Sequence, residues 1–456
     1  MIQAAIDYAS SHAEAHLDEL MELTSIPSIS TLRQHIPDIR RAAQWVADQM
    51  VKIGLEDVRI FFTSGHPVVF GQWAKAGPEA PTVLVYGHYD VQPADPLDEW
   101  RTDPFQPTIE DGNLYARGAS DDKGQFFTHL KSVQAYLETQ GTLPVNIKFM
   151  IEGEEEIGSP HLSDFIKEHL ERLAADVALV SDSHILGPDQ PSILYGLRGM
   201  AYTEVVVTGP THDLHSGVFG GTVRNPANAL CEIVAALKNE DGRVTVPGFY
   251  DNVRLDEAER AALSTVPFSE DGLRREAGVD QLWGEAGYTP LERIAARPTL
   301  DINGIWGGFT GEGAKTIIPS RAAAKISMRL VPDQEPERIF QLFSRHVQEL
   351  APPEVRVEVR RLADAVPVLI DRDIPEMRSA VAAYEKGFGK TPVFTREGGT
   401  IPVVGVFAEK LQIPTILMGF GLPDDRLHSP NEKFSVGNFH KGICTSIYFL
   451  DALGAD

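Results

Sequence analysis

Several apolar stretches of this sequence end in side chains that can bind a metal ion. They are His88 and Asp90 after VLVYG, Glu154, Glu155 and Glu156 after VNIKFMIEG, Asp182 after VALVS, and His428 in a turn-rich loop beyond PTILMGF. Unbroken apolar runs are typical of strands buried on both faces of a parallel sheet, and ligands collect at the carboxyl ends of such strands. We therefore expect these side chains to meet at one edge of a sheet.

An ordinary structural explanation exists for each of these residues taken alone. His88 and Asp90 fit a surface loop with a capping aspartate, and a run of glutamates is usually a solvated loop. Asp121 and Asp122 precede a helix predicted from residue 124, where aspartate is a common N-cap. One of two adjacent aspartates can cap while the other faces a site. The agreement between several strand ends favours a functional site over chance.

The residue types indicate a pair of metal ions. Two imidazoles and three carboxylates, without thiolates, suit Zn²⁺, Mn²⁺ or Co²⁺ but are too many ligands for one tetrahedral ion. Two ions bridged by a carboxylate would satisfy them. Such a pair activates a water and polarises a carbonyl or phosphoryl oxygen, which is hydrolase chemistry. A further glutamate beside the ligands would take the proton of the water.

The composition is that of a globular protein of at least two domains, with 456 residues of which 43% are hydrophobic. Its net charge of -24, from 41 basic and 65 acidic residues, argues against a nucleic-acid or anionic-membrane partner. Cys231 and Cys444 lie in different predicted helices, so neither a disulfide framework nor a thiolate zinc motif is expected. The first residues lack the basic region and the unbroken apolar region typical of a signal peptide, and no run approaches the about 20 apolar residues of a membrane span, so we expect a cytoplasmic protein.

The predicted elements form two kinds of domain. Strands at 56–62, 67–74, 82–90, 145–152 and 177–181 alternate with helices at 3–24, 39–53 and 124–139. Residues 200–360 then follow a β-α-β-β-α-β order, the ferredoxin-like signature, with a charged and partly helical insertion at 240–298. An α/β pattern returns with helices at 374–386, 401–411 and from 436, and a strand at 414–419. One catalytic domain made of both chain ends, with the ferredoxin-like unit inserted, explains this order.

Six motifs together resemble the M20 family of metallopeptidases, nearest its cytosolic nonspecific dipeptidase and carnosinase branch. They are GHYDVQP, GASDDKG, EGEEEIGS, VSDS, DLHSG and LHSPNEKF, and they cover nearly the whole chain in order. The resemblance implies an α/β fold: a di-metal catalytic domain with a mixed, largely parallel sheet covered by helices, and an inserted ferredoxin-like α+β lid and dimerisation domain. The expected catalytic domain comprises residues 1–198 and 363–456, and the expected insert comprises residues 199–362.

The same resemblance implies the metal ligands. His88, Asp121 and Asp182 would hold one ion, and Asp121, Glu156 and His428 the second, with Asp121 bridging. An aspartate at 182, where the acylase and carboxypeptidase branches resemble each other in using glutamate, favours the dipeptidase branch.

Glu155 would be the general base. Three glutamates precede Ile157, so the register of the motif is counted back from the Gly-Ser that follows, and Glu154 falls where the family varies. Asp90 would hold His88 in its metal-binding tautomer.

In the insert, the resemblance assigns two further residues. His215 of DLHSG would reach the partner subunit's site and stabilise the oxyanion, and Arg329 would bind the carboxylate of the substrate. From the residues alone, His215 is a loop histidine and Arg329 an outward residue on a strand. Glu397, Gly399 and Thr400 resemble the loop that lines the substrate pocket, although Gly-Gly-Thr is also a plain capping signal.

The resulting prediction is a homodimeric dipeptidase that binds two divalent ions per chain, Zn²⁺ or Mn²⁺. Its substrates would be dipeptides or short peptides with a free C-terminal carboxylate. Two alternatives stay open: deacylation of N-acyl amino acids with the same metals, and a non-catalytic metal-binding scaffold. The presence of Glu155 and of the complete ligand set favours catalysis.

Overall fold

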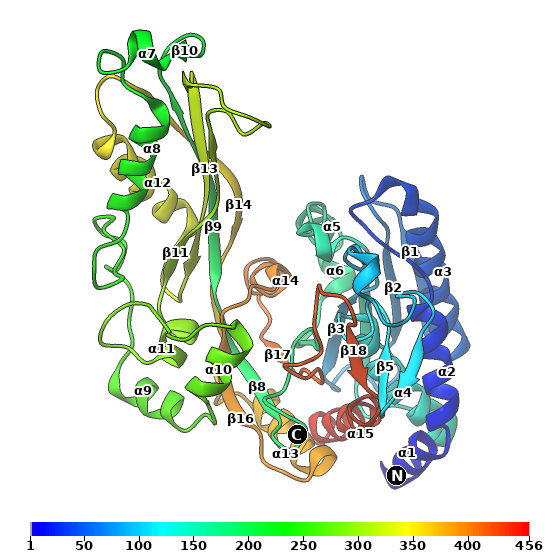
Figure 1. The fold of residues 1–456 in the computed structure, drawn as a ribbon. Coiled ribbons are helices and arrows are strands. Elements are labelled where there is room, and N and C mark those ends of the chain that lie inside the picture. Colours follow the sequence, from blue (N-terminus) through cyan, green and yellow to red (C-terminus); the bar gives the residue numbers. More distant parts are fainter. Residues whose placement is uncertain (1, 456) are drawn as a thin grey trace. The chain divides into compact units, whose positions relative to one another are not determined.

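The computed structural model describes residues 2–455, and contacts within the chain group them into two compact units (Figure 1). The first unit runs to Tyr195 and takes in Ile370–Phe394 and the chain from Ile401 on. The second unit comprises Gly196–Leu369 and Thr395–Thr400. The boundaries that the sequence predicts lie after residues 198 and 362, and the predicted insert does not include the short segment Thr395–Thr400.

Nine strands of the described chain form one mixed sheet. They are β1 (Glu56–Phe61), β2 (Val68–Trp73), β3 (Thr82–His88), β6 (Asn146–Glu152), β7 (Val177–Val180), β8 (Ser192–Leu197), β15 (Val368–Leu369), β16 (Val393–Glu397) and β17 (Thr415–Leu417). Their order is β1-β2-β6-β3-β7-β17-β8-β15, with β16 paired to β8. The central strands β6, β3, β7 and β17 are parallel, and the strands on either side of them pair antiparallel.

The strand β3 shows why the centre of the sheet forms. Its residues from Val83 to Tyr86 are all completely buried, as an apolar run without alternation predicts for a parallel strand covered on both faces. Burying one such aliphatic side chain stabilises the fold by about 1.5–3 kcal/mol. The predicted fold class, an α/β domain with a mixed sheet and a ferredoxin-like insert, is confirmed.

Helices pack on this sheet and on one another. They are α1 (Ile2–Ser11), α2 (Ala13–Thr24), α3 (Ile36–Lys52), α4 (Lys123–Gln140), α5 (Leu162–Glu168), α6 (Leu170–Leu173), α13 (Pro375–Phe388), α14 (Pro402–Val406) and α15 (Val436–Leu453), with the short turns η1 (Arg33–His35), η2 (Leu97–Glu99) and η3 (Glu155–Ile157). Helix α3 contacts β1 and β2, α4 contacts β3, and α15 contacts α4 and α13 (Figure 1). The apolar stripe of α3, with Ile39, Ala43, Val46 and Met50, is fully buried.

Two predicted helices are interrupted. The helix expected at residues 3–24 is broken at His12, whose backbone is not helical and whose Nδ1 lies 2.9 Å from the Tyr8 carbonyl oxygen. The helix expected at 401–411 consists of α14 followed by a π-helical turn, η4 (Phe407–Leu411). The wider turn buries the Phe407 ring against Tyr86 of β3. Apolar periodicity does not distinguish these local changes from a continuous helix.

A small three-stranded sheet joins distant parts of the first unit. Its strands β4 (Thr108–Glu110), β5 (Asn113–Tyr115) and β18 (Lys433–Ser435) pair antiparallel in the order β18-β5-β4. The sequence does not predict it because three-residue strands show no periodicity. Its pairing brings the chain after His428 beside the segment that leads to Asp121.

The second unit contains the predicted ferredoxin-like arrangement. Its elements are β9 (Gly199–Thr208), α8 (Pro226–Ala236), β11 (Thr299–Gly307), β13 (Arg321–Leu330), α12 (Pro336–Leu350) and β14 (Arg356–Ala365). The strand order is β11-β13-β9-β14, with antiparallel neighbours, and α8 and α12 contact the sheet over a shared apolar core.

The remaining elements of the second unit are short. They are β10 (Leu214–His215), α7 (Ser216–Phe219), β12 (Ile317–Ile318) and, in the 240–298 insertion, α9 (Glu257–Ser264), α10 (Glu270–Ala277) and α11 (Pro290–Ala295). Among residues 2–455, none of the helices has both the length and the apolar character needed to cross a membrane.

Candidate metal centre

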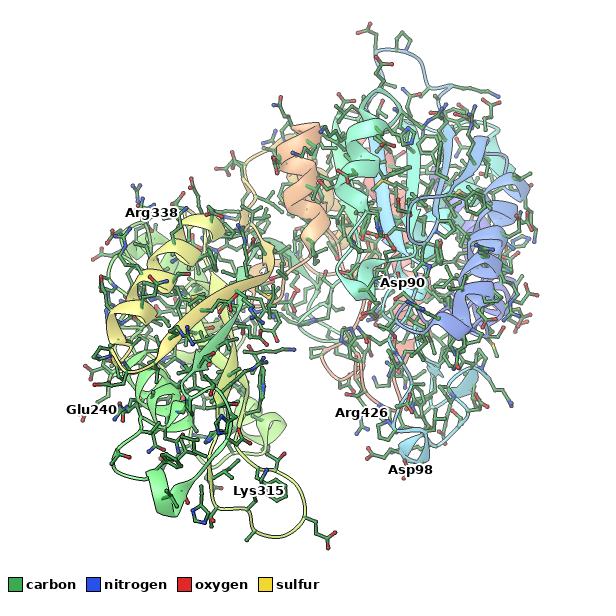
Figure 2. The ribbon with its side chains drawn as sticks, turned by 90° about the horizontal axis from the view of Figure 1, so that it is seen from above. Asp90, Asp98, Glu240, Lys315, Arg338 and Arg426 are labelled. Atoms are coloured by element: carbon green, nitrogen blue, oxygen red, sulfur yellow. The ribbon has the colours of Figure 1, made fainter. Side chains whose placement is uncertain are left out.

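The carboxyl ends of three parallel strands meet at one edge of the large sheet. His88 is the last residue of β3 and is paired with Glu152 at the end of β6. The segment with Glu155 and Glu156 follows β6, and Asp182 lies just beyond β7. Asp90 lies just past the end of β3 (Figure 2). The predicted meeting of these strand ends is therefore observed.

His88, Asp121 and Asp182 form a first group that can hold a metal ion. One ligand atom from each lies within 4.8 Å of the others. His88 Nε2 is 3.1 Å from Asp121 Oδ1 and 3.9 Å from Asp182 Oδ2. The His88 ring is completely buried, and its Nε2 has no hydrogen bond of proper geometry. A buried nitrogen without a partner, facing two carboxylates, fits coordination to a cation.

Asp121, Glu156 and His428 form a second group of the same kind. His428 Nε2 is 2.9 Å from Asp121 Oδ2 and 3.3 Å from Glu156 Oε2. The Glu156 side chain is 3% exposed, whereas that of His428 is 56% exposed. His428 has a φ of 59°, in the left-handed region that is unusual for residues other than glycine. Asp121 belongs to both groups, so one carboxylate can join two cations.

The electrostatics of the two ligand groups also favour bound cations. Burial raises the pKa of Glu156, and the nearby Asp121 carboxylate raises it further. Burial likewise raises the pKa of Glu155 well above its usual value, an effect that Asp182 and Asp121 reinforce. Hydrogen bonds to Asp121 and Glu156 raise the pKa of His428 to about 10. Negative charge is thus in excess in a buried place, where divalent cations would neutralise it.

Asp90 connects His88 to the glutamate segment. Its carboxylate accepts the backbone N–H groups of Glu155, at 3.2 Å, and Glu156, at 3.1 Å. Its carbonyl oxygen is 3.1 Å from His88 Nδ1, and its carboxylate is 3.4 Å from the same nitrogen. The contact with His88 is predicted by the sequence, but the two amide contacts depend on the tertiary fold. Asp90 therefore fixes both a ring nitrogen of His88 and the backbone that carries two glutamates.

Asp122 and Glu154 have other roles. The peptide bond between Asp121 and Asp122 is cis. Asp122 occupies the N-cap position of α4, but its side chain makes no capping hydrogen bond and instead accepts the His88 backbone N–H at 3.2 Å. The N-cap explanation is therefore wrong for Asp122. Glu154 accepts the His66 backbone N–H at 2.9 Å and lies 2.9 Å from His161 Nδ1, so it is neither solvated nor part of the two metal-binding groups.

Glu432, which was not predicted as a site residue, anchors the loop that presents Asp121. Its buried carboxylate accepts the backbone N–H groups of Gly118, Ser120 and Asp121 at 2.9–3.1 Å and pairs with Arg117 Nη1 at 2.7 Å. Both charged side chains are 1% exposed. Glu432 lies in the LHSPNEKF motif, four residues after His428, and that proximity to a candidate ligand was the available signal.

We expect this buried pair to contribute strongly to stability. Arg117→Met should lower the free energy of unfolding by about 3–5 kcal/mol, because it leaves the Glu432 carboxylate buried without its cation. Urea denaturation followed by circular dichroism measures the change. Lys75→Met is the matched control, since it breaks an exposed pair with Glu56 that should contribute at most about 1 kcal/mol. Equal losses in the two variants would contradict the role given to Arg117.

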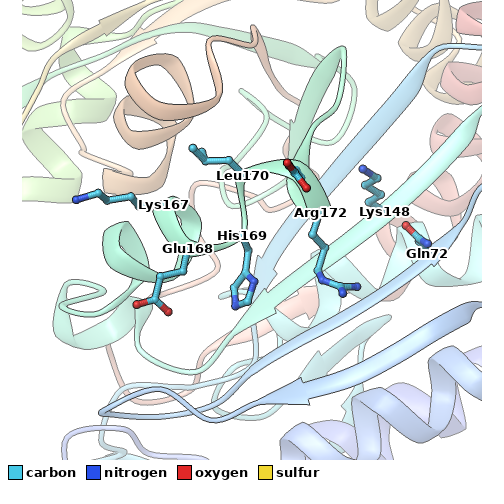
Figure 3. Close-up of a pocket in the computed structure, with 8 residues that line it drawn as sticks. Gln72, Lys148, Lys167, Glu168, His169, Leu170 and Arg172 are labelled. Atoms are coloured by element: carbon cyan, nitrogen blue, oxygen red, sulfur yellow. The ribbon is translucent and has the colours of Figure 1, made fainter.

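A large cavity in the first unit is distinct from the metal-binding groups. It has a volume of about 690 Å³ and is lined by Gln72, Lys148, Lys167, Glu168, His169, Leu170, Glu171 and Arg172 (Figure 3). Two of its basic side chains have structural partners: Lys148 donates to the Ala174 carbonyl oxygen, and Arg172 pairs with Asp57. None of these described lining residues is a predicted site residue. This cavity is not the candidate site.

Comparison with known proteins identifies the family. Residues 84–451 match the family model described as peptidase family M20/M25/M40. A Cys-Gly metallodipeptidase of Schizosaccharomyces pombe is 36% identical over 454 residues, which cover 94% of this chain and 94% of that protein. The chain belongs to peptidase family M20/M25/M40. The predicted family membership is thus confirmed.

Further M20 relatives are similar over nearly their whole length. The Beta-Ala-His dipeptidase of Homo sapiens is 31% identical, with 99% of this chain and 92% of that protein covered. A solved dipeptidase structure from Saccharomyces cerevisiae has a TM-score of 0.87 and 30% identity, and covers 100% of this chain and 99% of that chain. An M20 family metallo-carboxypeptidase structure from Sulfolobus solfataricus has a TM-score of 0.86 and 34% identity, with 97% and 99% covered.

The remaining predicted site residues of this M20 peptidase lie in the second unit. His215 is exposed at the start of α7, and its Nδ1 accepts the Gly217 backbone N–H at 3.0 Å. In the neutral ring, the hydrogen is then on Nε2, which is left as a donor.

Arg329 on β13 contacts the segment that contains Glu397, Gly399 and Thr400. We call residues 397–400 the substrate loop. Arg329 Nη1 donates to Thr400 Oγ1 at 2.8 Å, and Thr400 Oγ1 donates to the Arg198 carbonyl oxygen at 2.6 Å. The structure therefore brings Arg329 and Thr400, two predicted substrate-binding residues, into direct contact.

Arg198 is a second arginine beside this loop, and sequence analysis did not single it out. Its Nε donates to the Gly398 carbonyl oxygen and its backbone N–H to that of Gly399, both at 3.2 Å. A Cβ at Gly398 would lie 2.5 Å from Arg198 Nη2, so any larger residue would displace this guanidinium group. Burial and the neighbouring Arg329 lower the pKa of Arg198 to about 10. Two close guanidinium groups make this part of the second unit suitable for an anion.

Proposed function

We propose that this M20 peptidase hydrolyses the peptide bond of dipeptides, or of short peptides with a free C-terminal carboxylate, with divalent metal ions as cofactors. The observation that carries the proposal is the pair of ligand groups that share Asp121, with Glu155 beside them. Relatives named as Cys-Gly and Beta-Ala-His dipeptidases, similar over more than nine-tenths of this chain, support the substrate class.

In this proposal, the two groups hold two ions, Zn²⁺ or Mn²⁺. His88, Asp121 and Asp182 hold one, and Asp121, Glu156 and His428 hold the other. Imidazole and carboxylate ligands suit both metals. When bound, such ions supply the positive charge that activates a water molecule and polarises the carbonyl of the peptide.

The proton transfers are assigned to Glu155. A carboxylate oxygen of Glu155 accepts the proton of the attacking water and returns it to the nitrogen of the leaving amine. Asp90 supports this role because it holds the backbone N–H of Glu155 and the ring of His88 at the same time. Burial of the Glu155 carboxyl raises its proton affinity, as a group that must accept and then release a proton requires.

Substrate recognition is assigned to the second unit. Arg329 binds the C-terminal carboxylate, with Arg198 adding positive charge, and Glu397, Gly399 and Thr400 line the substrate pocket. His215 stabilises the oxyanion in the site of a partner subunit, which makes the enzyme a homodimer. We also place the protein in the cytoplasm, because its cysteines, Cys231 and Cys444, are both free.

Metal content and substrate preference test the proposal in one experiment. The protein is purified without added metal, and metals per chain are measured by elemental analysis. Hydrolysis of Ala-Ala and of N-acetyl-alanine is then followed before chelation, after chelation, and after Zn²⁺ or Mn²⁺ is returned. We expect two ions per chain, hydrolysis of the dipeptide but not of the acylated amino acid, and recovery with metal.

Each other outcome contradicts a separate part of the proposal. Faster hydrolysis of N-acetyl-alanine would make the protein a deacylase. Two ions without hydrolysis of any substrate at saturating metal would make it a metal-binding scaffold. One ion per chain with metal-restored hydrolysis would leave the substrate class standing and overturn the assignment of Asp121 as a shared ligand.

A further inference from the structure

The 240–298 insertion contacts the segment that carries the substrate loop. Arg396 precedes the loop directly, and its Nη2 forms an ion pair with Glu259 Oε1 at 2.8 Å. Glu259 is on α9, in the insertion, and both residues belong to the second unit. The side chains are 7% and 16% exposed, so this is a largely buried pair. Such a pair fixes its partners more firmly than an ion pair on the surface does.

The packing around Arg396 confines its side chain. Gly196 of β8 lies beneath it, and a Cβ at that glycine would be 2.9 Å from Arg396 Cγ. β16, which contains Arg396, pairs with β8. The stem of Arg396 therefore lies close against β8 while its guanidinium group reaches Glu259. The side chain of Arg396 is thus confined between β8 and Glu259, one residue before the substrate loop.

Several hydrogen bonds connect helix α9 to the rest of the insertion. Asp256 caps its start by accepting the Glu259 backbone N–H at 2.8 Å. Arg260, the next residue, makes two hydrogen bonds to Glu292 of α11, at 2.6 and 3.1 Å. Glu292 also completes a capping box with Thr289. Glu259 thus projects from a helix whose position is fixed by contacts inside the insertion.

The substrate loop is then held from three sides. Arg329 binds Thr400, Arg198 binds Gly398 and Gly399, and the Arg396 pair fixes the residue before Glu397. Arg329 lies on β13 of the ferredoxin-like part and Arg198 lies between β8 and β9, whereas Glu259 is the contribution of the insertion. The insertion therefore determines the position of one end of a loop that recognises substrate.

We propose that the 240–298 insertion is part of the substrate-recognition apparatus and that Glu259 is a positioning residue, acting through Arg396 on the substrate loop. This inference rests on the proposed function, since it assigns a role to the loop in binding dipeptides. Glu259 does not itself contact substrate. Its removal should weaken binding of the dipeptide and leave the chemical step nearly unchanged.

Glu259→Ala in the full-length, metal-loaded enzyme tests the proposal. Alanine is compatible with helix α9 and leaves Arg396 without this carboxylate. We expect KM for Ala-Ala to rise about tenfold with kcat changed less than about twofold, because a misplaced binding loop weakens substrate binding before it affects the chemistry. The charge-exchanged variant, Glu259→Arg with Arg396→Glu, should restore much of the KM. A structural defect alone would not be corrected by the exchange.

The control is Arg243→Ala, elsewhere in the same insertion. It breaks the pair with Glu285 and involves neither α9 nor Arg396. If the insertion only stabilises the protein, Arg243→Ala should raise KM as much as Glu259→Ala does, and the inference would be overturned. An unchanged KM in Glu259→Ala would also overturn it.

Hydrogen–deuterium exchange separates this inference from the proposed function. The amides of residues 396–400 should exchange about tenfold faster in Glu259→Ala than in the wild type, and should exchange at the wild-type rate in Arg243→Ala, because local opening governs exchange. If the wild type hydrolyses no dipeptide but the exchange result holds, the proposed function fails and the positioning contact stands. If the wild type is active and exchange at 396–400 does not change, the inference fails alone.

Discussion

Glu155→Gln is expected to lower kcat/KM for dipeptides by about 10³-fold, within the range that a general base contributes, and to leave two ions bound per chain. Glutamine keeps the size of the side chain but cannot accept the proton of a water. Glu155 belongs to neither of the two ligand groups, so its loss should not remove a metal ligand. Steady-state kinetics and elemental analysis on the same preparation measure kcat/KM and the number of ions per chain.

The neighbouring glutamates supply the controls, because three consecutive residues have three different surroundings. Glu154 interacts with His66 and His161, so Glu154→Gln should leave both metal content and kcat/KM near those of the wild type. Glu156 is in the second ligand group, so Glu156→Gln should lower metal content. If Glu155→Gln loses metal, or if Glu154→Gln shows the rate defect, the roles given to the three glutamates are wrong.

The strand ends of the site could be predicted because they depend on local sequence. An apolar run such as 83–86 forms a strand that is buried on both faces. The polar residue that follows the run therefore lies at the edge of the sheet. This reasoning predicts the positions of His88, Glu156 and Asp182. His428 follows the same logic less directly, since an irregular loop separates it from β17.

The contacts that support the site could not be predicted from local sequence. Asp90 binds amides 65 and 66 residues away, and Glu432 binds amides more than 300 residues away. Neither periodicity nor motif spacing reports such pairs, because they form only when the sheet and the small sheet β18-β5-β4 are complete. The same holds for Arg198, whose role follows from its approach to Gly398 and not from its residue type.

In the second unit, too, the regular elements could be predicted from the sequence and the tertiary contacts could not. Its β-α-β-β-α-β order could be predicted because each element is long and regular. The assignment of Thr395–Thr400 to that unit could not, since these residues follow helix α13 of the first unit, begin inside strand β16 and join the second unit only through contacts. The ion pair between Glu259 and Arg396 could not be predicted either, because it also forms only through tertiary contacts. It connects the insertion, which contains no family motif, to the substrate loop, which resembles one.

Asp121→Asn is expected to remove both metal ions, because Asp121 is the residue common to the two ligand groups. Its Oδ1 faces His88 Nε2 at 3.1 Å, and its Oδ2 faces His428 Nε2 at 2.9 Å. Asparagine has one oxygen in place of two and carries no charge, so one of the two groups loses a ligand and both lose attraction for a cation. Hydrolysis should fall by about 10³-fold or more, since bound metal lowers the barrier by several kcal/mol.

Two measurements distinguish this result from a folding defect. Zn²⁺ or Mn²⁺ binds the native state and should raise the melting temperature of the chelated wild type, whereas the melting temperature of Asp121→Asn should not respond. Asp98→Asn removes the same charge at an exposed position, so metal should raise its melting temperature as much as it raises that of the wild type. If Asp121→Asn kept two ions per chain, the shared carboxylate would have to be another residue. Loss of one ion alone would mean that Asp121 serves only one of the two groups.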